Sequence, residues 1–330
     1  MKKGQERFDF FINQLEALFT KASKQKNPAL WLYRNNARTP LFMLEALAKL
    51  YGNLHNKKKF GKIKEHFKLL EDALGSIDYY DNTAKDLLEN KKIPAAVTTY
   101  LQAEYREKLQ HLNEILTEDN WIHSEVSRLS KIKNKLAEAD WLAEAEEIKS
   151  IMEFYSEEVY KIVEFAQEKK YHFQNIETDV HELRRKLRWL SIYPQALQGC
   201  IQLTQSKKTA RHLAKYGTHE IVTSSFNKMP DAGDNKYVLL FDKNYYYALS
   251  WIIAALGKIK DEGLHIVAVK EALLAADKLT EEMAYKKTYQ LLGSKQKKLH
   301  VLLDEAEVIC KTYFTEQNLE HLITGVTRIP

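Results

Sequence analysis

Apolar residues recur at steps of three and four along most of this chain, the spacing of one face of an α-helix. A second such stripe rises from residue 60 and stops at Gly75, where the glycine is expected to cap the helix. Residues 95–173 contain neither Pro nor Gly, which predicts two or three long helices there. The first stripe, within residues 6–24, consists of Phe8, Phe11, Ile12, Leu15, Leu18 and Phe19.

One region departs from this helical pattern. The segments HEIVTSSF, from His219, and KYVLLF, from Lys236, are β-prone, and the residues between them carry Pro, Gly and Asp turn chemistry. We expect a small hairpin or ordered loop there. The segment HNKKKFGK, from His55, is expected to be a loop. Further helices are expected at 28–51 (with a kink or a new start at Pro40), 179–193, 207–215, 243–260, 266–291 and 295–321.

Composition supports a mainly helical globular protein. The 330 residues include only 11 Gly and 6 Pro, too few for the many hairpins of an all-β fold. Cys200 and Cys310 stand far apart without a CxxC pair, so neither a disulfide framework nor a cysteine zinc site is expected. The longest apolar run, 245–256, is too short to span a bilayer. The prediction is a cytoplasmic protein that does not bind membranes.

The net charge of +5 is mild, so a case for an anionic partner needs local clustering. Such a cluster occurs in DVHELRRKLRWLSIYP, residues 179–194. At helical spacing its three leucines lie on one side, and the opposite side holds His181, Arg184, Arg185 and Arg188. Guanidinium groups bind phosphate oxygens bidentately, so this face suits a phosphate chain. The alternative is a solvated face paired with acids such as Glu177 and Glu182.

A weaker copy of this arrangement occurs 150 residues earlier. Trp31, Arg34 and Arg38 have the same spacing as His181, Arg184 and Arg188. Each element is later followed by a helix ending in Leu-Gly, at Gly75 and at Gly293, with Lys68 and Lys286 seven residues before the respective glycine. The pattern predicts two diverged four-helix-bundle-like halves, residues 1–170 and 171–330, related by a pseudo-two-fold axis.

On these motifs the chain resembles the CHAD family, the conserved histidine α-helical domain. The resemblance implies two helical-bundle halves that bind inorganic polyphosphate along a central basic channel, without catalysis by the domain itself. Trp31 stands where the histidine of the first half is expected, which puts phosphate binding by that half in question. The motif matches are His181, Arg184, Arg188, Lys68, Gly75, Lys286 and Gly293.

The expected function is therefore non-catalytic binding of a linear polyanion, inorganic polyphosphate first. No GxGxxG, P-loop, HExxH or GxSxG motif occurs, and no cofactor or metal is expected. A helical scaffold for an acidic protein, RNA or single-stranded DNA binding, and a polyphosphate-processing activity remain as alternatives. The expected polyanion-binding residues are Arg34, Arg38, Lys64, Lys68, His181, Arg184, Arg185, Arg188, Lys208, Arg211 and Lys286.

Overall fold

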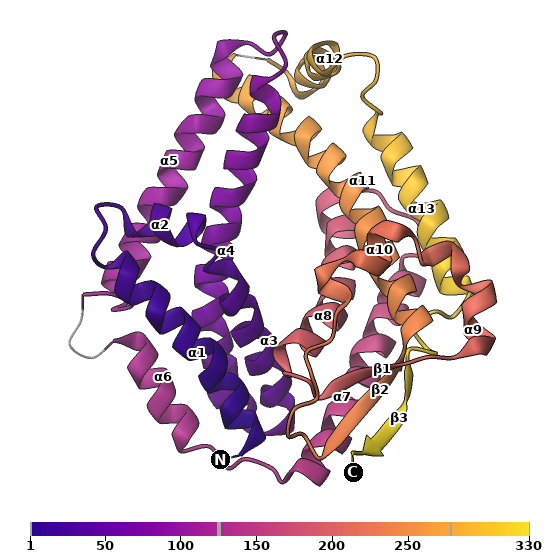
Figure 1. Cartoon of the computed structure of the whole chain (residues 1–330). Coiled ribbons are helices and arrows are strands. Elements are labelled where there is room, and N and C mark those ends of the chain that lie inside the picture. The colour runs from indigo at the N-terminus through magenta and orange to yellow at the C-terminus, as the bar shows by residue number, and fades with distance from the viewer. Residues whose placement is uncertain (1, 124–126, 278, 330) are drawn as a thin grey trace.

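The computed structural model describes residues 2–123, 127–277 and 279–329 (Figure 1). Most of these residues are helical, which confirms the predicted all-α class, and one small sheet is added. The helices are α1 (Lys3–Ala22), α2 (Pro28–Arg34), α3 (Arg38–Leu54), α4 (Lys57–Leu88), α5 (Ala95–Glu118), α6 (Arg128–Ala137), α7 (Glu144–Glu168), α8 (Glu182–Ala196), α9 (Lys207–His212), α10 (His219–Thr223), α11 (Lys243–Ala276), α12 (Glu281–Leu292) and α13 (Leu299–Thr315). The strands are β1 (Ile201–Thr204), β2 (Tyr237–Asp242) and β3 (Ile323–Arg328).

Helices α1 to α6 lie together on one side of the molecule (Figure 1). The apolar stripe of α1 is buried as its spacing predicts, and Phe8 contacts the rings of Tyr51, Phe60 and Trp141. Helix α4 packs against both α3 and α5. Burial of these stripes supplies most of the free energy that holds short helices together, because isolated helices of this length are marginal in water.

The other side of the molecule contains α7, α8, α11, α13 and the sheet (Figure 1). Strand β2 is central, parallel to β1 and antiparallel to β3. The rings of Tyr155 on α7, Tyr193 on α8 and Phe241 on β2 pack edge to face within this group. Helix α7 falls within the expected first half, yet it packs against α8, β2 and β3 as well as α3. No helix among the described residues is long and apolar enough to cross a membrane.

The two sides meet at two places. Helix α3 packs on α8, and α5 packs on α11 near the opposite end of the molecule, while the ribbons diverge between these contacts (Figure 1). At the second contact Leu87 and Val97 belong to the same apolar cluster as Val269 and Leu273. The main core cluster includes residues of both sides. The α3–α8 contact brings the basic face of α8 against the first side.

The expected hairpin is only half correct. KYVLLF forms β2, but HEIVTSSF is not a strand: Thr218 caps the short helix α10, and a 3₁₀ turn follows at Ser225. The buried amide of Asn227 donates to the carbonyl of Ile221 at 2.7 Å, so local side-chain hydrogen bonds replace strand pairing. The partners of β2 are instead β1 and the C-terminal strand β3.

Several expected helix ends are also wrong. Helix α4 begins at Lys57, where Asn56 caps it, so the HNKKKFGK segment is largely helical rather than a loop. It then continues through Gly75 to Leu88. Likewise residues 243–276 form one helix, α11, where a break between 260 and 266 was expected, and α12 begins separately at Glu281. Gly75 and Gly257 both lie inside these helices, and a guanidinium group occupies the space beside each, as described below.

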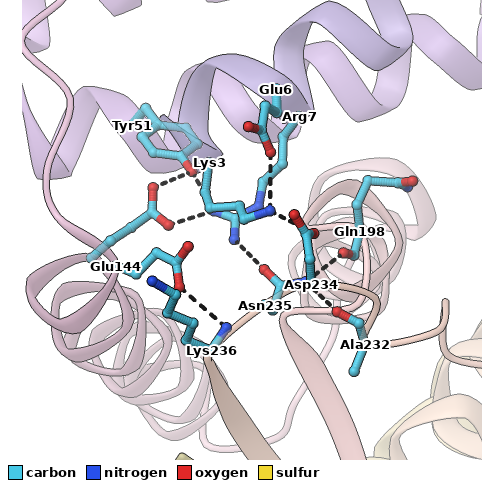
Figure 2. Close-up of polar contacts among 11 residues, drawn as sticks. Lys3, Glu6, Arg7, Tyr51, Glu144, Gln198, Ala232, Asp234, Asn235 and Lys236 are labelled. Carbon is cyan, nitrogen blue, oxygen red and sulfur yellow. Dashed lines mark hydrogen bonds and ion pairs between the residues drawn. The ribbon is translucent and has the colours of Figure 1, made fainter. Parts of the chain in front are cut away.

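A buried polar cluster joins α1 to α7 and to the loop before β2 (Figure 2). The Arg7 guanidinium pairs with Glu147 at 2.7 Å and donates to the Tyr51 hydroxyl at 2.6 Å and to the Asn235 side-chain oxygen at 3.2 Å. Tyr51 in turn donates to Glu147 at 2.8 Å. Arg7 is 4% exposed and Glu147 2%. Because both charges are paired and hydrogen-bonded, their burial is tolerated.

Candidate functional site

The α3–α8 contact gathers polar stripes from three helices. Steps of three and four put Arg38, Phe42 and Glu45 on one face of α3, and Arg184 and Arg188 on one face of α8. The same spacing puts the α4 residues Lys64, Lys68, Glu71, Gly75 and Asp78 on a single face. Since α3 packs on both α4 and α8, these stripes come together.

Three of these residues, Arg38, Arg184 and Arg188, form what we call the arginine cluster. The guanidinium carbons of Arg38 and Arg188 lie 5.1 Å and 4.3 Å from the centre of the Phe42 ring. Arg184 is close enough for its charge to lower the pKa of Arg188. The negative face of the Phe42 ring favours both cations, but it does not cancel their mutual repulsion.

The α8 members of the arginine cluster have no anionic partner. In the described part of the chain no carboxylate pairs with Arg184 or Arg188, and Arg184 donates only to the main-chain carbonyl of Ile253, at 3.2 Å. Burial, followed by the charges of Arg184 and Arg38, lowers the pKa of Arg188 to about 10. Burial also lowers the pKa of Arg184. Partly buried, unpaired guanidinium groups make a site that favours an added anion.

Arg38 differs from the other two members because acids already surround it. Its Nε donates to Glu71 at 2.6 Å, and its Nη1 lies 3.4 Å from Asp78. Glu71 is buried, and burial raises its pKa, although the charge of Arg38 opposes that shift. The first side therefore supplies a largely neutralised cation, and the positive potential is concentrated on α8.

Two glycines provide the space for these arginines. A Cβ atom on Gly75 would lie 2.6 Å from Nη2 of Arg38, and one on Gly257 would lie 3.1 Å from Nε of Arg184. These two contacts indicate that Arg38 corresponds to Arg184, which lies 146 residues later, whereas the expected offset was 150 residues. They also indicate that Gly75 corresponds to Gly257 rather than to Gly293. The sequences agree with this match: Ala-Leu-Gly-x-Ile occurs at 73–77 and at 255–259, and Arg-x-x-Leu-x-x-Leu begins at each arginine. On this match Asn35, not Trp31, is the counterpart of His181.

The glycine contacts predict opposite outcomes for two alanine substitutions in α4. Gly61→Ala meets nothing within 4 Å and should raise the free energy of unfolding by about 1 kcal/mol, since alanine favours helix. Gly75→Ala should lose that gain because its Cβ displaces Arg38 from Glu71. Urea denaturation of both variants measures the difference. Equal gains would mean that Arg38 moves away without cost.

Glu45 is a second unusual group beside the arginine cluster. It is buried, no hydrogen bond or ion pair to it is found among the described residues, and its neighbour on α4 is Glu71. Burial, and then the charge of Glu71, raises the pKa of Glu45 to about 7. A buried carboxylate with few donors favours its neutral form.

The raised pKa of Glu45 predicts how the free energy of unfolding depends on pH. Because the folded state holds the Glu45 proton more tightly than the unfolded chain, the stabilising contribution is present below the ordinary carboxyl pKa and is lost as pH rises through about 7. Glu45→Gln should therefore raise the free energy of unfolding at about pH 8 by about 1–2 kcal/mol and have little effect at about pH 5. Denaturation at the two pH values measures this. A pH-independent effect would contradict it.

The remaining expected residues on or near these helices are less available. Lys68 pairs with Asp72, Arg185 with Glu182 at 2.6 Å, and Nδ1 of His181 lies 2.9 Å from Glu177. For His181 and Arg185, these contacts agree with the alternative interpretation, in which the basic face of α8 is paired with Glu177 and Glu182. Lys64 and Arg34 make no ion pair within the described residues, and Arg34 is exposed at the end of α2.

Three expected residues lie away from the arginine cluster. Lys208 and Arg211 are exposed on α9, which is at the outer edge of the second side, where Thr209 and Asn244 hydrogen-bond to hold it in place (Figure 1). Lys286 is exposed on α12, which packs on α11 near its C-terminal end, away from α8. The expectation that these three residues join the cluster is not met.

The sequence reasoning missed Phe42, Glu45 and Glu71 as parts of the site. Phe42 lies four residues after Arg38 and Glu45 lies seven residues after it, so both share the helix face of Arg38, and this spacing could have identified them once Arg38 was chosen. Among the described residues no group of three or more His, Cys, Asp or Glu side chains is arranged to hold a metal ion.

Comparisons with known proteins add no relative. No protein-family model matches the sequence, no curated protein is significantly similar to it, and no solved structure matches its fold. The CHAD resemblance therefore remains a prediction based on the motifs.

Proposed function

We propose that this protein binds the phosphate groups of a linear polyanion, inorganic polyphosphate first, at the arginine cluster. One observation carries the proposal: Arg184 and Arg188 are adjacent, partly buried cations with no acidic partner among the described residues. A bound phosphate group would supply the missing negative charge and accept hydrogen bonds from the guanidinium groups of Arg184 and Arg188.

The binding mechanism needs no chemical step. The ligand displaces counterions and water, and its oxygens replace water as acceptors for Nη atoms of the two α8 arginines. Phe42 fixes the plane of the Arg188 guanidinium, which reduces the entropy lost on binding. Lys64, which has no ion pair among the described residues, extends the positive face along α4 for a longer chain.

We also propose that the two sides descend from one repeated helical unit, as the CHAD resemblance implies. The paired Arg38–Gly75 and Arg184–Gly257 contacts support this. The unit on the first side is the weaker binder, because Glu71 and Asp78 neutralise Arg38 and because Phe42 stands where the second unit has Arg188. Binding is thus centred on α8 rather than spread evenly between the two sides.

A fluorescence-anisotropy titration with labelled long-chain polyphosphate at several salt concentrations tests this function. With three cationic contacts, from Arg184, Arg188 and Lys64, log K should fall with log salt with a slope of about −2, by analogy with single-stranded nucleic acids. Unlabelled polyphosphate should displace the probe better than RNA does. Preferential displacement by RNA would favour the nucleic-acid alternative, and absence of binding at low salt would leave the protein-scaffold alternative.

A further inference from the structure

The arginine cluster has a buried acid beside it that the proposed binding reaction does not use. Glu45 lies on the same face of α3 as Arg38 and Phe42, next to Glu71 on α4. Glu71 is bound by Arg38 and is also within electrostatic reach of Arg188. Two buried carboxyl groups therefore lie next to each other at the edge of the arginine cluster, and only Glu71 is held by an arginine.

We infer that Glu45 is a proton-controlled switch of the anion site, with the neutral acid permitting tight binding and the carboxylate weakening it. This inference rests on the proposed function. Ionisation of Glu45 adds a second negative charge next to Glu71, which lowers the positive potential at Arg38 and Arg188. It also attracts Lys64 and Lys68, whose charges act on Glu45, and so competes with the ligand for them.

The groups around Glu45 make it the acid that titrates near neutral pH. Arg38 donates to Glu71 at 2.6 Å and opposes the rise that burial causes in the pKa of Glu71, whereas no donor reaches Glu45 among the described residues. The other charged or titratable groups that interact with Glu45 are Lys64, Lys68 and Asp72 from α4 and Tyr193 from α8. On the other helices packed against α3, Glu158 of α7 is bound by Lys49 and Tyr193, Arg7 of α1 is bound by Tyr51 and Glu147, and Arg188 of α8 acts on Glu71.

Linkage fixes the sign of the effect. An anion that prefers neutral Glu45 must raise the proton affinity of Glu45 when it binds, so binding takes up protons near neutral pH. Affinity should accordingly increase as pH falls from about 8 to about 6. Burial already raises the pKa of Glu45 to about 7 in the free protein, which places the change in this window.

The test measures the affinity for labelled long-chain polyphosphate at about pH 8 and about pH 6, where the internal phosphate groups of the probe stay ionised. All proteins carry His181→Asn, so that the comparison is made without this imidazole. In that background affinity should rise about fivefold or more toward the lower pH. Glu45→Gln should bind tightly at both pH values.

Asp72→Asn is the matched control, because it removes one negative charge that acts on Glu45 from the neighbouring helix α4, without removing the buried acid. It should strengthen binding at both pH values, and binding should still tighten toward the lower pH. Proton uptake, measured by titration calorimetry in two buffers, should be seen in the parent and absent in Glu45→Gln. If Glu45→Gln keeps the parent's pH ratio, the switch is refuted while anion binding stands. If the parent binds at neither pH, the proposed function fails and the switch fails with it.

Discussion

Replacing Arg7 with methionine is expected to lower the free energy of unfolding by about 3–5 kcal/mol. The guanidinium is buried between Glu147, Tyr51 and Asn235, so its loss leaves the Glu147 carboxylate buried with only the tyrosine hydroxyl as a donor (Figure 2). An uncompensated buried charge costs far more than the lost contact itself. Urea denaturation of the variant measures the change.

Two further variants make this prediction specific. Adding Glu147→Gln to Arg7→Met removes the stranded charge and should recover a large part of the loss. Lys133→Met breaks the exposed ion pair between α6 and Glu16 of α1, and should cost less than about 1 kcal/mol. Equal losses for Arg7→Met and Lys133→Met would show that the buried cluster does not depend on its charges.

Arg188→Met, in contrast, is expected to raise the free energy of unfolding and to weaken polyphosphate binding. The arginine bears a desolvation and repulsion penalty that methionine, of similar length, lacks, so the free energy of unfolding without anion should rise by about 2 kcal/mol. The guanidinium is charged in both folded and unfolded states well below about pH 10, so this gain should not change between about pH 6 and about pH 8. Affinity for polyphosphate should fall about 10- to 100-fold.

A gain in stability with a loss of binding separates a ligand site from a structural cation. If Arg188 stabilised the fold, its replacement would lower the free energy of unfolding, as expected for Arg7. Polyphosphate should also raise the unfolding temperature of the unchanged protein and leave that of Arg188→Met unaffected, because only a ligand that binds the folded state stabilises it. A destabilised variant that still binds polyphosphate would contradict this account.

Helical periodicity was sufficient to predict the fold class and the basic face of α8. Leu183, Leu187 and Leu190 are fully buried, as their spacing requires, and this turns Arg184 and Arg188 toward the other side of the helix. The small sheet escaped prediction because β1 and β3 are short and lie far from β2 in the sequence. Their pairing depends on tertiary packing rather than on local propensity.

The site was predictable only where one helix defines it. Glycine signals a helix end by default, so Gly75 suggested a cap, whereas it lies inside α4 and makes room for Arg38 from another helix. Gly257 makes room for Arg184 in the same way, and nothing in the local sequence indicated that contact. Spacing along the chain also cannot show which cations have acidic partners. Arg38 and Arg188 look equivalent in sequence, but Glu71 and Asp78 neutralise only the former through an ion pair.

The most direct test of the central claim compares polyphosphate binding by the unchanged protein, by Arg188→Met and by Arg185→Met. Arg185 lies on the same helix but is exposed and paired with Glu182, so it is the matched control. The account predicts salt-dependent binding that Arg185→Met changes by less than about threefold and that Arg188→Met, still folded, loses by about 10- to 100-fold. Equal affinities for the two variants would contradict an anion site at the arginine cluster.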